Sequence, residues 1–124
     1  MQKSKKNKPL VIIGGDPKST FNEILIKTFG SKIHKKIKFP IILICSKKLL
    51  VDESKNLKKK IDFKDLNKNI SILKKKIYIL DIPLKYKNLS IQKTNSYIKK
   101  CFEIGLDILK KKNSLALING PISK

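Results

Sequence analysis

The stretch LVIIGGDPKST (residues 10–20) predicts the fold class, because it places a buried strand directly before a turn and the start of a helix. Its first four residues form an uninterrupted apolar run, a pattern typical of a strand that is covered on both faces. Gly14 and Gly15 then end the strand, and Pro17 stiffens the turn. Strands of this kind occur in parallel sheets that carry helices on their faces.

A helix is expected directly after this turn. Thr20 and Glu23 have the spacing of a capping box, in which the Thr20 hydroxyl accepts from the backbone N–H of Glu23 and the Glu23 carboxylate reaches back. Apolar residues follow at helical spacing, and Gly30 is the expected end of this helix.

Further segments continue the alternation of strand and helix. Helices are predicted over residues 49–60 and 91–111, whereas residues 61–69 have an irregular pattern. The longer helix has an apolar stripe in steps of three and four, which includes Ile91, Ile98 and Leu106. The short apolar runs that we expect to be buried strands are residues 39–46, 76–83 and 114–118. The order predicts an α/β fold: a mainly parallel sheet with helices on both faces.

A chain of 124 residues fits one domain. Residues 1–8 are expected to form a basic tail, and residues 9–124 to form the α/β domain. No helix follows the last predicted strand to cover it, so the domain is expected to be incomplete and to expose part of that strand.

The formal net charge of +21 leaves two interpretations open. One is a small basic module that binds nucleic acid. Against it, all 30 basic residues are lysine, there is no arginine to contact phosphate or guanine in bidentate fashion, and the lysines occur in every segment. Lysine, isoleucine and asparagine all have A/T-rich codons, so an AT-rich genome is the other explanation. We therefore expect no specific nucleic-acid partner.

The cysteines and the histidine indicate no catalytic or metal centre. Cys45 and Cys101 lack C-x-x-C or zinc spacing and lie in apolar patterns, so we interpret them as buried thiols of a reducing cytoplasm. His34 lies in a lysine-rich connection and is expected to be exposed. The first apolar run ends at Gly14, which is too short for a signal peptide or a membrane span.

Two loops lie where open parallel sheets bind ligands, beyond the carboxyl ends of strands. In the first, Asp16 is expected to point into a cleft. In the second, Asn119 can donate and accept hydrogen bonds, Gly120 lets a ligand approach the backbone, and Lys124 can meet a phosphate or carboxylate. Neither loop has a Walker A or G-x-G-x-x-G pattern. The alternative is that both are structural turns, with Asp16 capping the backbone and Lys124 in solvent.

Three stretches resemble one enzyme family in order and spacing. They are LVIIGGDP (residues 10–17), LSIQKTNSYIKKCFEIGLDIL (residues 89–109) and SLALINGPISK (residues 114–124). They are similar to the opening strand and turn, the long helix and the Ala-Leu-Ile-Thr-Gly-Pro-x-x-Lys signature of 4-hydroxythreonine-4-phosphate dehydrogenases, enzymes of pyridoxal phosphate biosynthesis. The resemblance covers residues 9–124, but only the N-terminal part of a family whose chains are more than twice as long.

The resemblance implies an α/β/α fold of the isocitrate and isopropylmalate dehydrogenase type. It also implies an NAD-dependent oxidation and decarboxylation of 4-phosphooxy-threonine, a divalent metal held by histidines, and a homodimer. Asp16, Asn119, Gly120 and Lys124 are the pocket residues that carry over. Membrane partners are not expected.

This chain departs from the family in three places. Lys18 to Asn22 stand where the family has Ala-Gly-Ile-Gly-Pro, and Asn119 replaces a threonine. The family's His-Thr substrate pair and metal histidines come after the Gly-Pro-x-x-Lys loop, so this chain holds no catalytic or metal-binding residue. We therefore expect an N-terminal fragment that is inactive by itself. A nonfunctional remnant is the remaining alternative.

Overall fold

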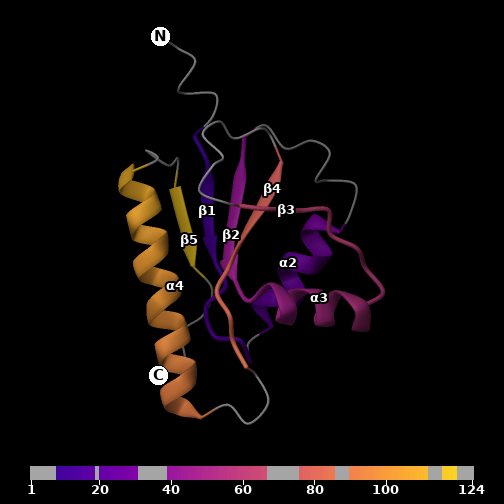
Figure 1. The fold of residues 1–124 in the computed structure, drawn as a ribbon. Coiled ribbons are helices and arrows are strands. Elements are labelled where there is room, and N and C mark those ends of the chain that lie inside the picture. Colours follow the sequence, from indigo (N-terminus) through magenta and orange to yellow (C-terminus); the bar gives the residue numbers. More distant parts are fainter. Residues whose placement is uncertain are drawn as a thin grey trace.

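The computed structural model describes residues 8–18, 20–30, 39–66, 76–85, 90–111 and 116–119. Within these ranges the chain forms one five-stranded sheet and three helices (Figure 1). The strands are β1 (Leu10–Ile13), β2 (Ile41–Cys45), β3 (Lys64–Asp65), β4 (Ile77–Asp81) and β5 (Ala116–Asn119). The helices are α2 (Phe21–Phe29), α3 (Lys47–Asn56) and α4 (Ile91–Lys111).

All paired strands of the sheet are parallel, in the order β3-β4-β2-β1-β5. Ile13 near the end of β1 lies opposite Ile44 of β2 and opposite Asn119 of β5. Since parallel strands run in one direction, their carboxyl ends meet at the same edge of the sheet. The predicted parallel sheet is confirmed.

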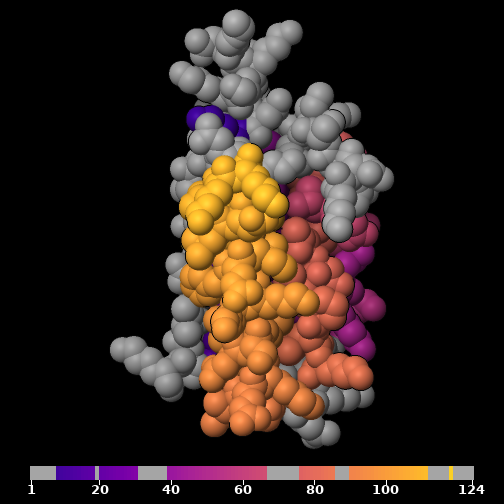
Figure 2. Space-filling view, turned by 60° about the vertical axis from the view of Figure 1, so that its left-hand side comes forward, coloured from indigo at the N-terminus to yellow at the C-terminus, as the bar shows by residue number. Residues whose placement is uncertain are grey.

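The helices cover both faces of the sheet, with α2 and α3 on one face and α4 on the other (Figure 1). Side chains alternate between the two layers: Leu43 of β2 packs on the side of α2 and α3, whereas Ile42 packs on the side of α4. All five residues of β2 are buried, which explains why its sequence is apolar throughout. The α4 helix forms one whole side of the molecule (Figure 2).

The limits of several elements follow the sequence prediction closely. Strand β1 and helix α4 have the predicted bounds, and α2 ends before Gly30 as expected. Strand β3 lies in the segment that was predicted to be irregular. The sequence did not predict this strand, because its two residues are both exposed and neither is apolar. It is held by pairing with β4, after which Leu66 N–H donates to the Ile79 carbonyl at 2.8 Å.

The predicted apolar stripe of α4 was wrong at two positions. Ile91 is 80% exposed because it begins the helix, which extends past the carboxyl ends of β1 and β5 (Figure 1). Leu106 is 47% exposed, because its neighbour Gly105 is the residue that faces the sheet. Tyr97 is buried instead and belongs to the layer between α4 and the sheet.

The predicted capping box at the start of α2 was also wrong. Thr20 has φ −77° and ψ 1°, which is outside the extended region that lets a side chain turn back, and its hydroxyl caps no N–H. Glu23 pairs with Lys27 at 3.1 Å instead. The side-chain cap forms at α3, where Ser46 is extended (φ −73°, ψ 116°) and its Oγ accepts from Leu49 N–H at 3.3 Å.

Parts of the sequence-based predictions lie outside the described residues. They include most of the basic tail and the connection that holds His34. Strand β5 is an edge of the sheet in the described part of the chain, and its Ile118 is 45% exposed. No helix within the described ranges is long and apolar enough to cross a bilayer.

The two helix starts provide a matched test of capping. Replacing Ser46 by alanine (S46A) removes the acceptor of Leu49 N–H, so we expect the free energy of unfolding to fall by about 1 kcal/mol. The T20A substitution removes a hydroxyl that caps nothing, and should cost less than about 0.5 kcal/mol. Urea unfolding of both variants measures the difference. Equal losses would contradict the assignment of the cap to Ser46.

Candidate functional site

The candidate site is the edge of the sheet where the strands have their carboxyl ends. The turn that contains Asp16 follows β1 directly, and β5 ends at Asn119, opposite Ile13 of β1. The two loops singled out in the sequence therefore leave neighbouring strands at the same edge. Open parallel sheets bind ligands at this position.

The first loop is built tightly against β2. Gly15 has φ 72°, a conformation that favours glycine, and a Cβ on Gly14 would lie 2.9 Å from the Cβ of Cys45. Asp16 Oδ1 accepts a hydrogen bond from Lys18 N–H at 2.9 Å. The Asp16 carboxylate thus stabilises its own turn, which agrees with the alternative that Asp16 caps the backbone. The side chain is half-exposed at the edge of the sheet. Ligand binding by Asp16 stays a prediction.

Asn22 gives this loop a polar feature that the sequence analysis did not single out. It is one of the residues at which the chain departs from the family pattern, and its side chain is buried. Within the described residues its Oδ1 has no hydrogen-bond partner, and it would lie 3.8 Å from a Cβ on Gly14. A buried acceptor of this kind normally meets a donor, such as a water or a ligand N–H.

The second loop is placed only by its first residue. The backbone of Asn119 ends β5, whereas Gly120 and Lys124 lie outside the described residues. The structure therefore fixes where this loop begins. The roles of Asn119, Gly120 and Lys124 stay predictions.

A buried hydrogen bond joins α4 to the same edge. The Ser46 N–H, directly after β2, donates to the Tyr97 hydroxyl at 2.7 Å. Burial raises the pKa of Tyr97, and its hydroxyl also shares a side-chain hydrogen bond with Cys101. The Tyr97 ring is 5% exposed, so its position is fixed by packing as well as by this bond.

Lys47 connects three more groups near this edge. Its backbone N–H donates to Asp81 Oδ1 at 2.9 Å, at the end of β4. Its Nζ lies 2.9 Å from Asp65 Oδ1 and 5.9 Å from the centre of the Phe63 ring. Asp81 and Asp65 are therefore engaged in holding β3, β4 and α3 together.

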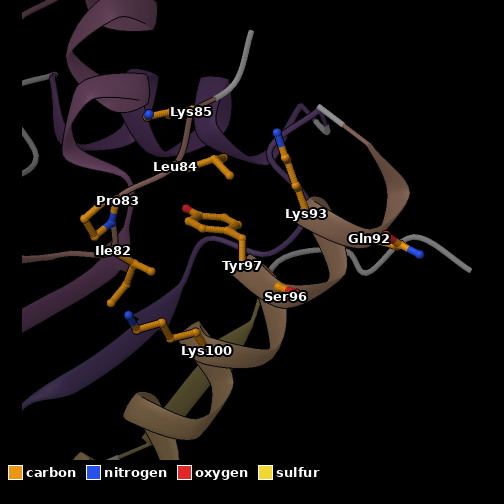
Figure 3. Close-up of a pocket in the computed structure, with 9 residues that line it drawn as sticks. All are labelled: Ile82, Pro83, Leu84, Lys85, Gln92, Lys93, Ser96, Tyr97 and Lys100. Carbon is orange, nitrogen blue, oxygen red and sulfur yellow. The ribbon is translucent and has the colours of Figure 1, made fainter. Parts of the chain in front are cut away.

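A pocket that the sequence analysis missed lies between the segment after β4 and the first turns of α4 (Figure 3). Its volume is about 410 Å³, within the range of small-molecule sites. The lining residues are Ile82, Pro83, Leu84, Lys85, Gln92, Lys93, Ser96, Tyr97 and Lys100. The sequence carried one weak signal for it: Lys93, Tyr97 and Lys100 have the spacing of one helix face.

The described residues do not fit a divalent metal. Among them there is no group of three His, Cys, Asp or Glu side chains that could hold a metal ion. Binding of NAD by these residues stays a prediction.

The two cysteines provide a test of this edge. Burial raises the pKa of Cys45 to about 12 and that of Cys101 to about 11. At pH 8 only about one Cys45 in ten thousand would then be a thiolate, the form that reacts. We expect neither thiol of the folded chain to react with a disulfide reagent, and both to react in guanidinium chloride. Rapid reaction of the folded chain, with an unchanged circular dichroism spectrum, would contradict this burial.

Comparison with known proteins bears on the fold. No protein-family model and no curated protein matches the sequence. Among solved structures, a protein assigned as a 4-hydroxythreonine-4-phosphate dehydrogenase from Salmonella typhimurium matches with a TM-score of 0.76 at 15% identity. A 4-hydroxythreonine-4-phosphate dehydrogenase from Burkholderia phymatum matches with a TM-score of 0.76 at 11% identity. Both matches cover 95% of this chain, which spans only 39% and 37% of the two structures. The predicted α/β fold is thus confirmed as one that this chain shares with part of these two structures.

Proposed function

We propose that this chain is the amino-terminal part of a dehydrogenase that oxidises and decarboxylates 4-phosphooxy-threonine in pyridoxal phosphate synthesis. The observation that carries the proposal is the parallel pairing of β1 with β5. It brings the GGDP turn and the start of the INGPISK loop to one edge, in a fold shared with two structures described as 4-hydroxythreonine-4-phosphate dehydrogenases.

In this proposal the edge forms one wall of the active site. Asn119 and Gly120 approach the substrate, and Lys124 supplies a cation for its phosphate. Asp16 shapes the neighbouring turn. NAD, a divalent metal and a second copy of the chain complete the site, and residues outside the described part hold the metal, since the described part has no cluster that fits one.

Binding of nucleic acid remains the alternative hypothesis. Lysines occur on α3, for example Lys47 and Lys48, and on α4, for example Lys99 and Lys100. These helices lie on opposite faces of the sheet, so their charge is not gathered in one stripe (Figure 1). A distribution of this kind favours salt-sensitive, nonspecific contact with polyanions over a dedicated groove.

The DNA beyond the codon for Lys124 tests the proposed function directly. We expect an open frame, in phase or shifted, that encodes a His-Thr pair and further histidines, because these groups would bind the substrate and the metal. The measurement is the genomic sequence itself, confirmed on the transcript. Absence of such residues from every forward frame would contradict the proposal.

The purified 124-residue chain is expected to be catalytically inactive. In the proposed function the histidines that would hold the metal come after Lys124, so the chain would lack the Lewis acid needed to polarise the alcohol and to stabilise the enolate that decarboxylation leaves. The assay follows NADH formation from 4-phosphooxy-threonine, NAD and Mg²⁺, with the Burkholderia phymatum enzyme as the positive control. NADH formation in proportion to the concentration of the chain would show that this expectation is wrong.

A further inference from the structure

The pocket between the segment after β4 and α4 has the chemistry of a binding site that the proposed function does not assign. We propose that it binds a small organic phosphate, with the phosphate near Lys93 and Lys100 and the apolar part of the ligand against the wall formed by Pro83, Leu84 and Tyr97. This inference rests on the lining of the pocket. It does not depend on the dehydrogenase activity or on the loops of Asp16 and Asn119.

The positive charge of the pocket is uncompensated. Lys85, Lys93 and Lys100 all line it, and no carboxylate is among the lining residues. All nine carboxylate side chains of the protein lie in the described ranges, and the ion pairs there involve Lys27, Lys47 and Lys111. Within the described part of the chain, no pocket lysine therefore has a carboxylate partner. An anion bound in the pocket would be attracted by these ammonium groups together.

The two lysines of α4 are held on either side of one aromatic ring. Lys93 lies four residues before Tyr97 and Lys100 three residues after it, so all three share one face of the helix. Figure 3 shows the Tyr97 ring in the middle of the pocket, with Lys93 and Lys100 extending from the helix turns on either side of it. A ligand in the pocket beside this ring is within reach of two cations.

The apolar part of the pocket is formed before any ligand arrives. The Tyr97 hydroxyl accepts the Ser46 N–H at 2.7 Å, which fixes the ring. Ile82 is buried beside it, and Leu84 covers the ring from the other segment (Figure 3). Because these side chains are already immobilised, a ligand loses little free energy in ordering them. Pockets with apolar walls and a few convergent polar groups are typical of small-molecule sites.

The start of α4 adds to the preference for an anion. Gln92, Lys93 and Ser96 belong to its first two turns, where the helix dipole is positive. Ser90 accepts from Lys93 N–H at 3.1 Å, so this helix start is ordered. The volume of about 410 Å³ admits a small molecule but not a nucleic-acid duplex.

Phenyl phosphate, inorganic phosphate and phenol test the pocket on the whole 124-residue chain. We expect phenyl phosphate to bind at least about tenfold more tightly than either of its halves, because only phenyl phosphate uses the apolar wall and the lysines together. Binding is followed by titration in an NMR experiment, with the largest shifts expected at the amides of Leu84 and Ser96. Circular dichroism spectra check that the chain, and the variants described next, are folded.

Two double variants distinguish phenyl phosphate binding in the pocket from nonspecific attraction of this anion to a basic protein. K93Q/K100Q removes two charges from the pocket, and should weaken phenyl phosphate binding by about tenfold or more. K99Q/K110Q removes two charges from the same helix outside the pocket lining, and should change binding by less than about twofold.

Equal weakening in both double variants would overturn the proposal, since it would show attraction to net charge alone. Shifts spread over the whole chain, or phenol binding as tightly as phenyl phosphate, would overturn it as well. If K93Q/K100Q fails to fold, the single variants K93Q and K99Q make the same comparison. The DNA sequence beyond Lys124 has no bearing on these results, so failure of the proposed function and failure of this inference are distinguishable.

Discussion

The parallel pairing around β2 is the constraint on which the rest of the structure depends. Every residue of β2 is buried, and the strand is flanked by β1 and β4 and covered by helices on both faces. A strand in this position must be apolar throughout, and parallel strands need crossover connections, such as those that contain α2 and α4. As a result all carboxyl ends collect at one edge. The turn of Asp16, the end of β5 at Asn119 and the pocket after β4 are consequences of this single arrangement.

The hydrogen bond between Ser46 and Tyr97 connects that edge to α4. Ser46 uses its Oγ to cap α3 and its N–H to bond Tyr97, so one buried residue positions two helices on opposite faces of the sheet. Loss of either contact would leave a buried polar group without a partner, which costs about 1–3 kcal/mol. The pocket follows from this bond, because the ring that it fixes is the wall between Lys93 and Lys100. The same residue thus contributes to stability and to the shape of a binding surface.

The sequence predicted the strands and helices that have a periodic apolar pattern. It did not predict the features that depend on contacts with residues far away in the chain or on the local backbone conformation. Strand β1 and helix α4 were placed correctly, because continuous and helical apolar patterns are local signals. The two residues of β3 carry no such signal, since pairing with β4 alone makes them a strand. The cap was assigned to Thr20 from spacing, but the backbone angles there do not permit it, whereas Ser46 has the extended conformation that does. The pocket is lined by residues 82–85 and by residues 92–100, two segments that no sequence motif brings together, so only its lysine spacing was visible.

The position of the charges is more informative than their number. A net charge of +21 produced by lysines in every segment predicts attraction to polyanions without naming a site. The ion pairs of the described residues show where charge is used for structure: Lys47 holds Asp65, and Lys111 and Lys27 pair with acids one helical turn away. Lys93 and Lys100 are different, because they face a preformed apolar pocket and have no carboxylate partner within the described residues. Placement of this kind, rather than composition, separates a candidate site from the basic background of the chain.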